Sequence, residues 1–266
     1  STNMIDYALD PVIILTLSLA VIVGGLGFPV WLELHSRWRL PDRWSLHTKI
    51  TLAATGMLLL VGWVAMTLLE WNNEDTLGSM PVHGKILNGF FASVVPRTAG
   101  FNSIDYGEMQ PEGLLITNML MFAGGGSGST AGGIKVTTFS LLALMALAEM
   151  RGTPDITAFG RRIAVSIQRQ ALTIAFAGIN VVVLGALLLM MLTPYGFTET
   201  IFESISAFAT VGLSMNLTPQ LSGAADAVLI ALMYLGRVGP LTLAVALLLR
   251  RHPRRFRYPE ERPLVG

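Results

Sequence analysis

This sequence has no cysteine and few charged residues. Its 266 residues include no cysteine, so it offers no thiol chemistry or disulfide of its own. Only 13% of the residues are charged, whereas a soluble domain has about 25%. The formal net charge is +1, which argues against nucleic acid as a partner. These shortages indicate that lipid, rather than water, is the main solvent of the folded chain.

Hydrophobic residues make up 52% of the chain, and the mean hydropathy is +0.59. They gather in five apolar stretches, one of which is interrupted by glycines. A membrane-spanning helix needs about 20 predominantly apolar residues, and each unbroken stretch meets this length. We therefore predict an all-α, polytopic transmembrane protein. The stretches are residues 11–31, 47–71, 112–149, 165–192 and 224–249.

Basic and acidic residues alternate between successive connections of these stretches. Cytoplasmic connections of membrane proteins carry an excess of Lys and Arg, so we expect the basic connections to be cytoplasmic in a multi-pass protein of the inner (plasma) membrane. The basic set is Arg37, Arg39, Arg43, Lys49, Arg151, Arg161, Arg162, Arg169, Arg250, Arg251, Arg254, Arg255, Arg257 and Arg262. The acidic set is Asp6, Asp10, Glu70, Glu74, Asp75, Asp105, Glu108, Glu112, Glu199, Glu203 and Asp226.

An internal repeat relates two parts of the chain without gaps. Phe90 aligns with Phe202, Thr98 with Thr210 and Gly100 with Gly212. Two acidic connections also contain an apolar segment, at residues 89–95 and 201–213. Because each of these connections begins and ends on the same side, we expect each apolar segment to be re-entrant. The repeating unit is therefore a helix, a re-entrant loop and a second helix.

Each re-entrant segment ends in Thr-x-Gly followed by a large apolar residue. A dehydrated K⁺ ion needs a cage of carbonyl oxygens, which backbone loops supply. Glycine allows the unusual backbone angles that turn carbonyls toward one axis, and the negative C-terminal end of a preceding short helix favours a cation. We expect the large residues, Phe101 and Leu213, to wedge the loops. The two Thr-x-Gly loops comprise Thr98, Ala99, Gly100 and Phe101, and Thr210, Val211, Gly212 and Leu213.

A run of ten residues with six glycines interrupts the third apolar stretch. Each Gly costs about 1 kcal/mol of helix propensity relative to Ala, so the helix breaks here. Irregular backbone at membrane depth is tolerated where it is buried in protein or lines a water-filled cavity, so the run marks a functional cavity. This glycine run comprises Gly124, Gly125, Gly126, Ser127, Gly128, Ser129, Thr130, Ala131, Gly132 and Gly133.

Residues 96–102, 206–214 and 124–138 resemble the pore loops and the following segment of the Trk/Ktr/HKT superfamily of K⁺ transporters. The chain looks most like the KtrB-type membrane subunits. The resemblance implies potassium ion uptake across the cell membrane through a carbonyl-lined filter, in a fold with four helix–pore loop–helix repeats around one pore. It implies K⁺ at Thr98, Ala99, Gly100, Thr210, Val211 and Gly212.

The resemblance also divides the chain, which we expect to be the C-terminal portion of a longer protein. Residues 1–34 correspond to the closing helix of the second repeat, and residues 35–49 to a cytoplasmic loop. Residues 47–163 and 164–251 correspond to the third and fourth repeats, and residues 252–266 to a cytoplasmic basic tail. The resemblance further implies a homodimer, a cytoplasmic nucleotide-binding regulatory ring of the RCK type, and Na⁺ as a coupling or activating ion.

The resemblance also implies that the glycine run is an intramembrane gate below the filter. Lys135 follows the run, and Arg237 lies in the corresponding helix of the last repeat. An intramembrane cation is costly unless it is paired or wetted, so each is a candidate gate residue. Two other roles stay open at this point. The alternative for Lys135 is that its side chain only extends toward the cytoplasmic face. The alternative for Arg237 is a purely structural role, in which it binds carbonyls of a broken helix.

Three other readings compete with this hypothesis. Gly125-Gly126-Ser127-Gly128 resembles the serine motif of intramembrane proteases, but the sequence places no histidine base near Ser127, so we do not expect an enzyme. A secondary transporter with broken helices, for a small ion or an anionic substrate, explains the glycines but not the paired Thr-x-Gly loops. A non-conducting membrane scaffold for a cytoplasmic regulator explains only the basic connections.

Overall fold

The computed structural model describes residues 3–221 and 223–249, with side chains described as far as Gly239. The expected basic tail at residues 252–266, like Arg250 and Arg251 before it, lies outside the described residues. The described chain is mostly helical with almost no strand, which confirms the predicted all-α fold. The strands β1 (Thr157–Ala158) and β2 (Arg161–Arg162) have two residues each and form an antiparallel hairpin within a basic connection.

The long helices coincide closely with the predicted apolar stretches. They are α1 (Pro11–Leu26), α3 (Leu46–Leu69), α7 (Val165–Leu192) and α9 (Ala224–Leu249). Asp10 caps α1 by accepting from the backbone N–H of Val12, and Ser45 caps α3 by accepting from that of Thr48. Two described helices are long and apolar enough to cross a membrane, or three if α1 and the next helix form one bent span.

The first predicted stretch, residues 11–31, is wrong in its last five residues. The helix ends at Leu26, and α2 (Phe28–Arg37) leaves at an angle of 94°. Gly27 joins the two helices with a φ of +91°, and the N–H of Phe28 donates to the carbonyl of Gly128 in the glycine run. The bend therefore depends on a contact with a segment about 100 residues away, which hydropathy along the chain does not report.

Shorter helices lie between the long ones. Two helices of 13 residues precede the Thr-x-Gly loops, α4 (Val82–Val94) and α8 (Phe197–Ala209). The predicted broken stretch consists of α5 (Pro111–Phe122) and α6 (Val136–Met150), which flank the glycine run. Short turns of other helix types lie at Ile5–Tyr7, Pro41–Arg43, Glu74–Gly78 and Thr218–Gln220.

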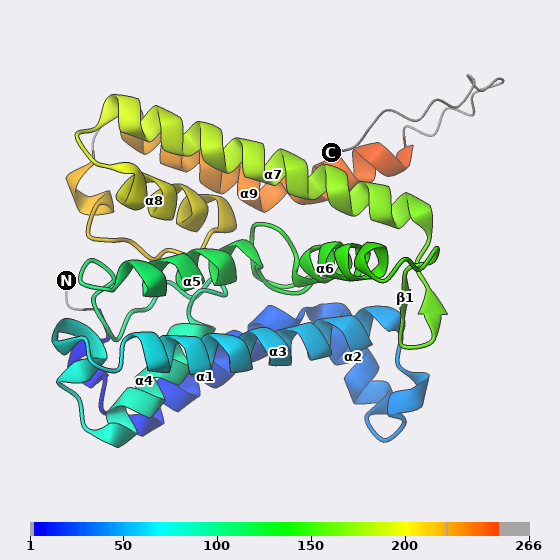
Figure 1. The fold of residues 1–266 in the computed structure, drawn as a ribbon, viewed down its shortest axis with the longest axis horizontal. Coiled ribbons are helices and arrows are strands. Elements are labelled where there is room, and N and C mark those ends of the chain that lie inside the picture. The colour runs from blue at the N-terminus through cyan, green and yellow to red at the C-terminus, as the bar shows by residue number, and fades with distance from the viewer. Residues whose placement is uncertain (1–2, 222, 250–266) are drawn as a thin grey trace.

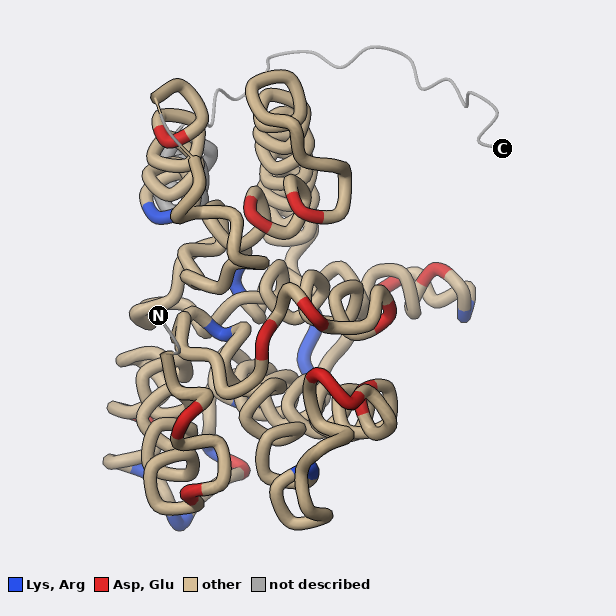
Figure 2. The backbone as a smooth tube through the Cα atoms, turned by 90° about the vertical axis from the view of Figure 1, so that its left-hand side faces the viewer, with Lys and Arg blue, Asp and Glu red and all other residues tan. Residues whose placement is uncertain are grey.

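The helices form three layers (Figure 1). Helices α7, α8 and α9 form one outer layer, α5 and α6 lie in line in the middle, and α1 to α4 form the other outer layer. The basic α2–α3 connection and the β1–β2 hairpin lie at one end, opposite the end at which α4 and α8 begin. Figure 2 views the molecule from the end at which α4 and α8 begin. Charged residues are few and scattered along the backbone, and most of the chain is uncharged.

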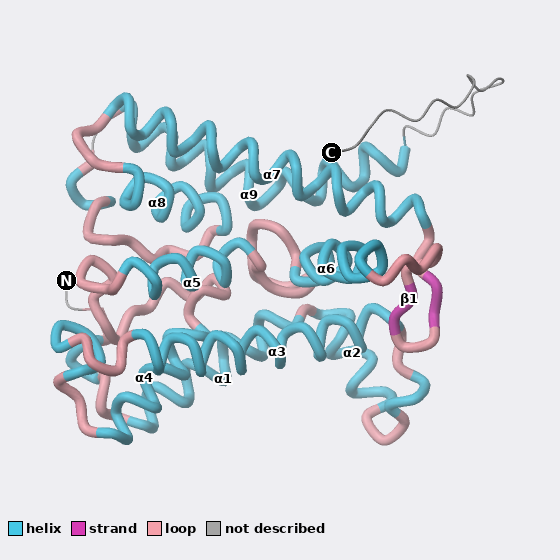
Figure 3. Tube along the Cα trace, in the orientation of Figure 1, coloured by secondary structure: helices cyan, strands magenta, loops and turns pink. Residues whose placement is uncertain are grey.

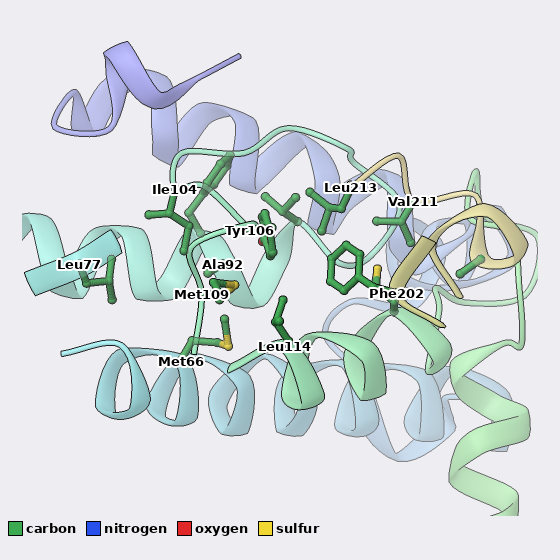
Figure 4. Close-up of a cluster of buried hydrophobic side chains, with 14 of the residues drawn as sticks. Met66, Leu77, Ala92, Ile104, Tyr106, Met109, Leu114, Phe202, Val211 and Leu213 are labelled. Carbon is green, nitrogen blue, oxygen red and sulfur yellow. The ribbon is translucent and has the colours of Figure 1, made fainter. Parts of the chain in front are cut away.

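The main hydrophobic cluster contains side chains of α1, α3, α4, α5 and α8 and of the loops beside them, most of which Figure 4 labels. Phe202 of α8 is fully buried and packs against Tyr106 with ring centroids 5.9 Å apart. Val211 and Leu213 of the second Thr-x-Gly loop belong to the same cluster. The packing of these helices therefore fixes the position of that loop.

Candidate functional site

The two Thr-x-Gly loops have the same alternation of backbone conformation. Thr98 and Thr210 have φ angles of +71° and +54°, and Gly100 and Gly212 have +71° and +91°. The residue between each pair does not have a positive φ. A β-branched residue with a positive φ is a genuine outlier, and such a conformation costs about 1–2 kcal/mol. The same strain at both repeat-related threonines is the kind of feature that accompanies a functional site.

The two loops meet at their glycines. A Cβ atom on Gly100 would lie only 2.8 Å from the carbonyl oxygen of Val211 and 3.3 Å from the Cα of Gly212. A Cβ on Gly212 would in turn lie 3.3 Å from the Cα of Gly100. Backbone therefore packs directly against backbone, and only glycine at position 100 permits this distance. The structure brings together the residues that the repeat predicted to be equivalent.

Hydrogen bonds and burial hold the second loop more firmly than the first. The Ser206 hydroxyl donates to the carbonyl of Leu213 at 2.6 Å, and the N–H of Val211 donates to the carbonyl of Ser206 at 2.8 Å. Leu213 is 3% exposed, as expected for a wedge, but Phe101 is 39% exposed. The prediction that Phe101 wedges its loop is wrong, because Leu213 packs in the main cluster (Figure 4) and Phe101 does not.

Buried polar side chains surround the two loops. Arg97 is 4% exposed and donates from Nη2 to the carbonyl of Thr55 at 3.4 Å, which braces the first loop against α3. Ser214 donates to the Glu203 carboxylate and accepts from the N–H of Leu217 at 3.1 Å. Ser214 therefore orders the chain that follows the second loop.

The glycine run crosses the middle layer between α5 and α6 (Figure 3). The N–H of Gly126 donates to the carbonyl of Gly25 in α1 at 2.7 Å. The N–H of Gly133 donates to the carbonyl of Gly236 in α9 at 3.0 Å. Glycine-containing segments of two different helices, α1 and α9, are therefore hydrogen-bonded through the run.

The glycine run also lies directly against the second Thr-x-Gly loop. A Cβ on Gly132 would lie 2.7 Å from Cγ2 of Thr210 and 3.0 Å from the carbonyl oxygen of Ala209. A Cβ on Gly133 would lie 2.9 Å from the Cα of Ala209. These distances leave no room for larger side chains, so the composition of the run permits the close approach.

Both candidate cations reach carbonyls of the glycine run. Lys135 donates from Nζ to the carbonyl of Ala131, and Arg237 donates from Nη1 to the carbonyl of Thr130. The two side chains come from different helices and bind neighbouring residues of one loop. The structure therefore unites every residue of the predicted gate in one place.

Sequence reasoning missed a buried carboxylate at the end of α3. Glu70 is fully buried and accepts from Asn73 Nδ2 and Thr76 Oγ1, each at 2.7 Å. It also accepts from the N–H of Gln110 at 3.1 Å, at the start of α5. The signal was weak, because Glu70 was counted only among the acidic residues of its connection. Sequence reasoning also missed Gly25 as a partner of the run, since nothing local connects Gly25 with Gly126.

Known proteins resemble the chain over almost its full length. The family model for TrkH, described as a cation transport protein, matches residues 1–256. Potassium uptake protein B of the Ktr system is 37% identical in Bacillus subtilis and 40% identical in Vibrio alginolyticus, over 99% and 100% of this chain. The potassium/sodium uptake protein NtpJ of Enterococcus hirae is 40% identical over 96% of this chain.

The chain spans less than two thirds of these relatives, namely 59%, 58% and 57% of their lengths. Its fold is similar to that of the potassium transporter TrkH from Vibrio parahaemolyticus, with a TM-score of 0.67 and 17% identity. That match covers 87% of this chain and 50% of the other. The family match and the apolar helices identify a membrane protein, and the chain belongs to the TrkH family of cation transport proteins.

Proposed function

We propose that this chain forms part of a potassium uptake pathway, in which carbonyls of the two Thr-x-Gly loops bind K⁺. The observation that supports it most is the shared backbone of the loops, with positive φ at Thr98, Gly100, Thr210 and Gly212. Strained backbone of this kind turns carbonyls out of the regular hydrogen bonding of a helix, and backbone carbonyls of such loops replace the hydration shell of a cation. The names of the relatives, which refer to potassium uptake, favour K⁺ as that cation.

The short helices support a cation rather than an anion at this position. Helices α4 and α8 both end just before a Thr-x-Gly loop. The C-terminal end of a helix carries a partial negative charge equivalent to about half an electron. Two such ends directed at the loops favour positive charge between them. In this proposal the K⁺ ligands come from Thr98, Ala99, Gly100, Thr210, Val211 and Gly212, and Phe101 and Leu213 complete the two filter segments.

The glycine run is proposed as the gate of this pathway. It lies against Thr210 and Ala209, so its position controls the space on one side of the second loop. Hydrogen bonds from Lys135 and Arg237 hold two of its carbonyls. An unpaired cation within a membrane is energetically costly. Movement of the run would break these hydrogen bonds, so they keep the run in place.

The remaining parts of the proposal concern location and partners. The basic connections gather at one end (Figure 1), which is cytoplasmic by the distribution of Lys and Arg. We place the protein in the inner (plasma) membrane, as a homodimer with an RCK-type regulatory ring on the cytoplasmic end. Na⁺ is proposed as a coupling or activating ion, in line with the potassium/sodium name of one relative.

Replacement of Gly212 by Ser in the full-length protein tests the filter. Gly212 has a φ of +91°, so Ser at this position is strained and displaces the carbonyls that surround it. We expect K⁺/Na⁺ discrimination to fall at least several-fold in ion flux into proteoliposomes. Gly160→Ser is the matched control, because Gly160 also has a positive φ but nothing within 4 Å of its Cβ position. Unchanged discrimination in Gly212→Ser would refute the filter assignment.

A further inference from the structure

A cavity of about 370 Å³ lies beside the glycine run, where the run meets the starts of α6 and α7 and the middle of α9. Polar side chains from all four of these segments line it. Ser127 and Arg237 are exposed, so solvent reaches the cavity. Its polar lining includes Ser127, Ser129, Lys135, Thr138, Gln170 and Arg237.

The charge of this cavity is entirely positive. Lys135 and Arg237 both face it, and none of its lining residues is Asp or Glu. Within the described part of the chain, no carboxylate forms an ion pair with either cation; the ion pair found there joins Arg162 and Asp155 in the β1–β2 hairpin. Two like charges on one cavity repel each other, and the repulsion is stronger where the surroundings exclude water. An anion in the cavity relieves this repulsion.

Both cations also have N–H donors that make no hydrogen bond to the described residues. Among the described residues, Lys135 makes one hydrogen bond with its three N–H groups, and Arg237 makes one with its five. The hydroxyls of Ser127 and Thr138 and the amide of Gln170 add further donors around the same space. A tetrahedral oxyanion has enough acceptor positions to use several of these donors at once, whereas chloride is a single small acceptor.

We propose that this cavity binds a phosphate group, held by Lys135 and Arg237 and oriented by the surrounding hydroxyl and amide groups. The phosphate group belongs either to free inorganic phosphate or to the headgroup of an acidic lipid. Both sources present unesterified, negatively charged phosphate oxygens to the cavity. The site lies outside the two Thr-x-Gly loops, and binding there does not depend on the proposed ion pathway.

Occupation of the site has a consequence for the glycine run, and this step rests on the proposed gate. A phosphate group bound to the free donors draws both cations toward the cavity, and so competes with the carbonyls of Ala131 and Thr130 for Lys135 and Arg237. It also neutralises positive charge beside the proposed K⁺ route. Bound phosphate therefore loosens the run and lowers the electrostatic barrier to cations.

Equilibrium dialysis of the full-length protein with radiolabelled phosphate tests the site without any transport measurement. We expect saturable binding by the wild type and at least tenfold weaker binding by Lys135→Gln and by Arg237→Gln, since each loses a charge-assisted hydrogen bond. Arg151→Gln removes a cation from the end of α6, outside the cavity, and should bind as the wild type does. Thr138→Val serves as a second test if either charge variant fails to fold. It keeps both charges but loses one hydroxyl of the cavity, so we expect it to bind phosphate several-fold more weakly than the wild type.

A second arm distinguishes the source of the phosphate group. The wild type and the variants are reconstituted into nanodiscs of phosphatidylcholine with 10% phosphatidic acid, and the lipid retained on purification is measured by mass spectrometry. Retention of phosphatidic acid by the wild type alone, without binding of free phosphate, assigns the site to a lipid headgroup. Binding of free phosphate assigns it to the inorganic ion. Equal binding by the wild type and both charge variants, or no binding in either arm, overturns the proposal. Loss of K⁺ selectivity is not a readout here, so failure of the pore assignment stays separate.

Discussion

Gly100→Ala is the change for which the structure gives the sharpest expectation. The substitution is unfavourable for two reasons, a backbone conformation that L-residues rarely adopt and a steric overlap of the new methyl group. Position 100 has a φ of +71°, which costs an L-residue about 1–2 kcal/mol. Its Cβ would also lie 2.8 Å from the carbonyl oxygen of Val211, where an ordinary contact is about 3.5 Å. Relief of this overlap requires backbone movement, because both partners are main-chain atoms, and overpacking of this kind costs about 1–3 kcal/mol.

The two effects together predict a loss of about 2–5 kcal/mol of stability for Gly100→Ala. They also predict that the carbonyl of Val211 moves by a few tenths of an ångström or more, which changes a proposed K⁺ ligand. The measurements are thermal unfolding of the full-length protein in detergent and K⁺ against Na⁺ flux into proteoliposomes. We expect lower thermal stability and at least several-fold lower K⁺/Na⁺ discrimination.

Gly152→Ala separates the two effects. Gly152 has a similar φ of +64°, but nothing lies within 4 Å of its Cβ position. It should therefore lose only the conformational contribution of about 1–2 kcal/mol and keep wild-type discrimination. If Gly100→Ala matched Gly152→Ala in both measurements, the contact between the two loops would not matter, and our reasoning would be refuted.

Two further predictions concern the glycine run and the end of α3. Deletion of residues 125–132 should raise K⁺ flux in the full-length protein, because it removes the backbone between Gly25 and Gly236; an unchanged flux in a folded variant would contradict the gate. Glu70→Ala should lower stability by about 3 kcal/mol in thermal unfolding, since three donors lose a buried carboxylate, and a loss below about 1 kcal/mol would show that water replaces it.

Much of the helical architecture follows from local sequence features. Residues 165–192 and 224–249 were predicted as apolar stretches with the same limits that α7 and α9 have. Such limits are set by the length of an apolar run and by the polar residues at its ends, both of which are local. The glycine run was likewise predicted to break its helix, because glycine propensity is a local property.

The errors occurred where distant segments decide a local conformation. The first stretch was predicted to continue to Trp31, but Gly27 turns the chain where it meets Ser127 and Gly128. Phe101 and Leu213 occupy equivalent positions in the repeat, yet only Leu213 enters the main cluster. In both cases the residue type permits either outcome, and the neighbouring helices select one of them.

The sequence by itself determined that this is a helical membrane protein with paired Thr-x-Gly loops. Hydropathy, charge alternation and repeats depend only on the types and order of the residues. Only the tertiary structure decided that Gly100 meets Val211 and Gly212, and that Gly25 and Gly236 both bind the glycine run. It also decided which carbonyls Lys135 and Arg237 bind, and that the two cations share one cavity. These contacts join residues about 100 positions apart in most cases, and the packing of whole helices, rather than any local preference, sets their distances.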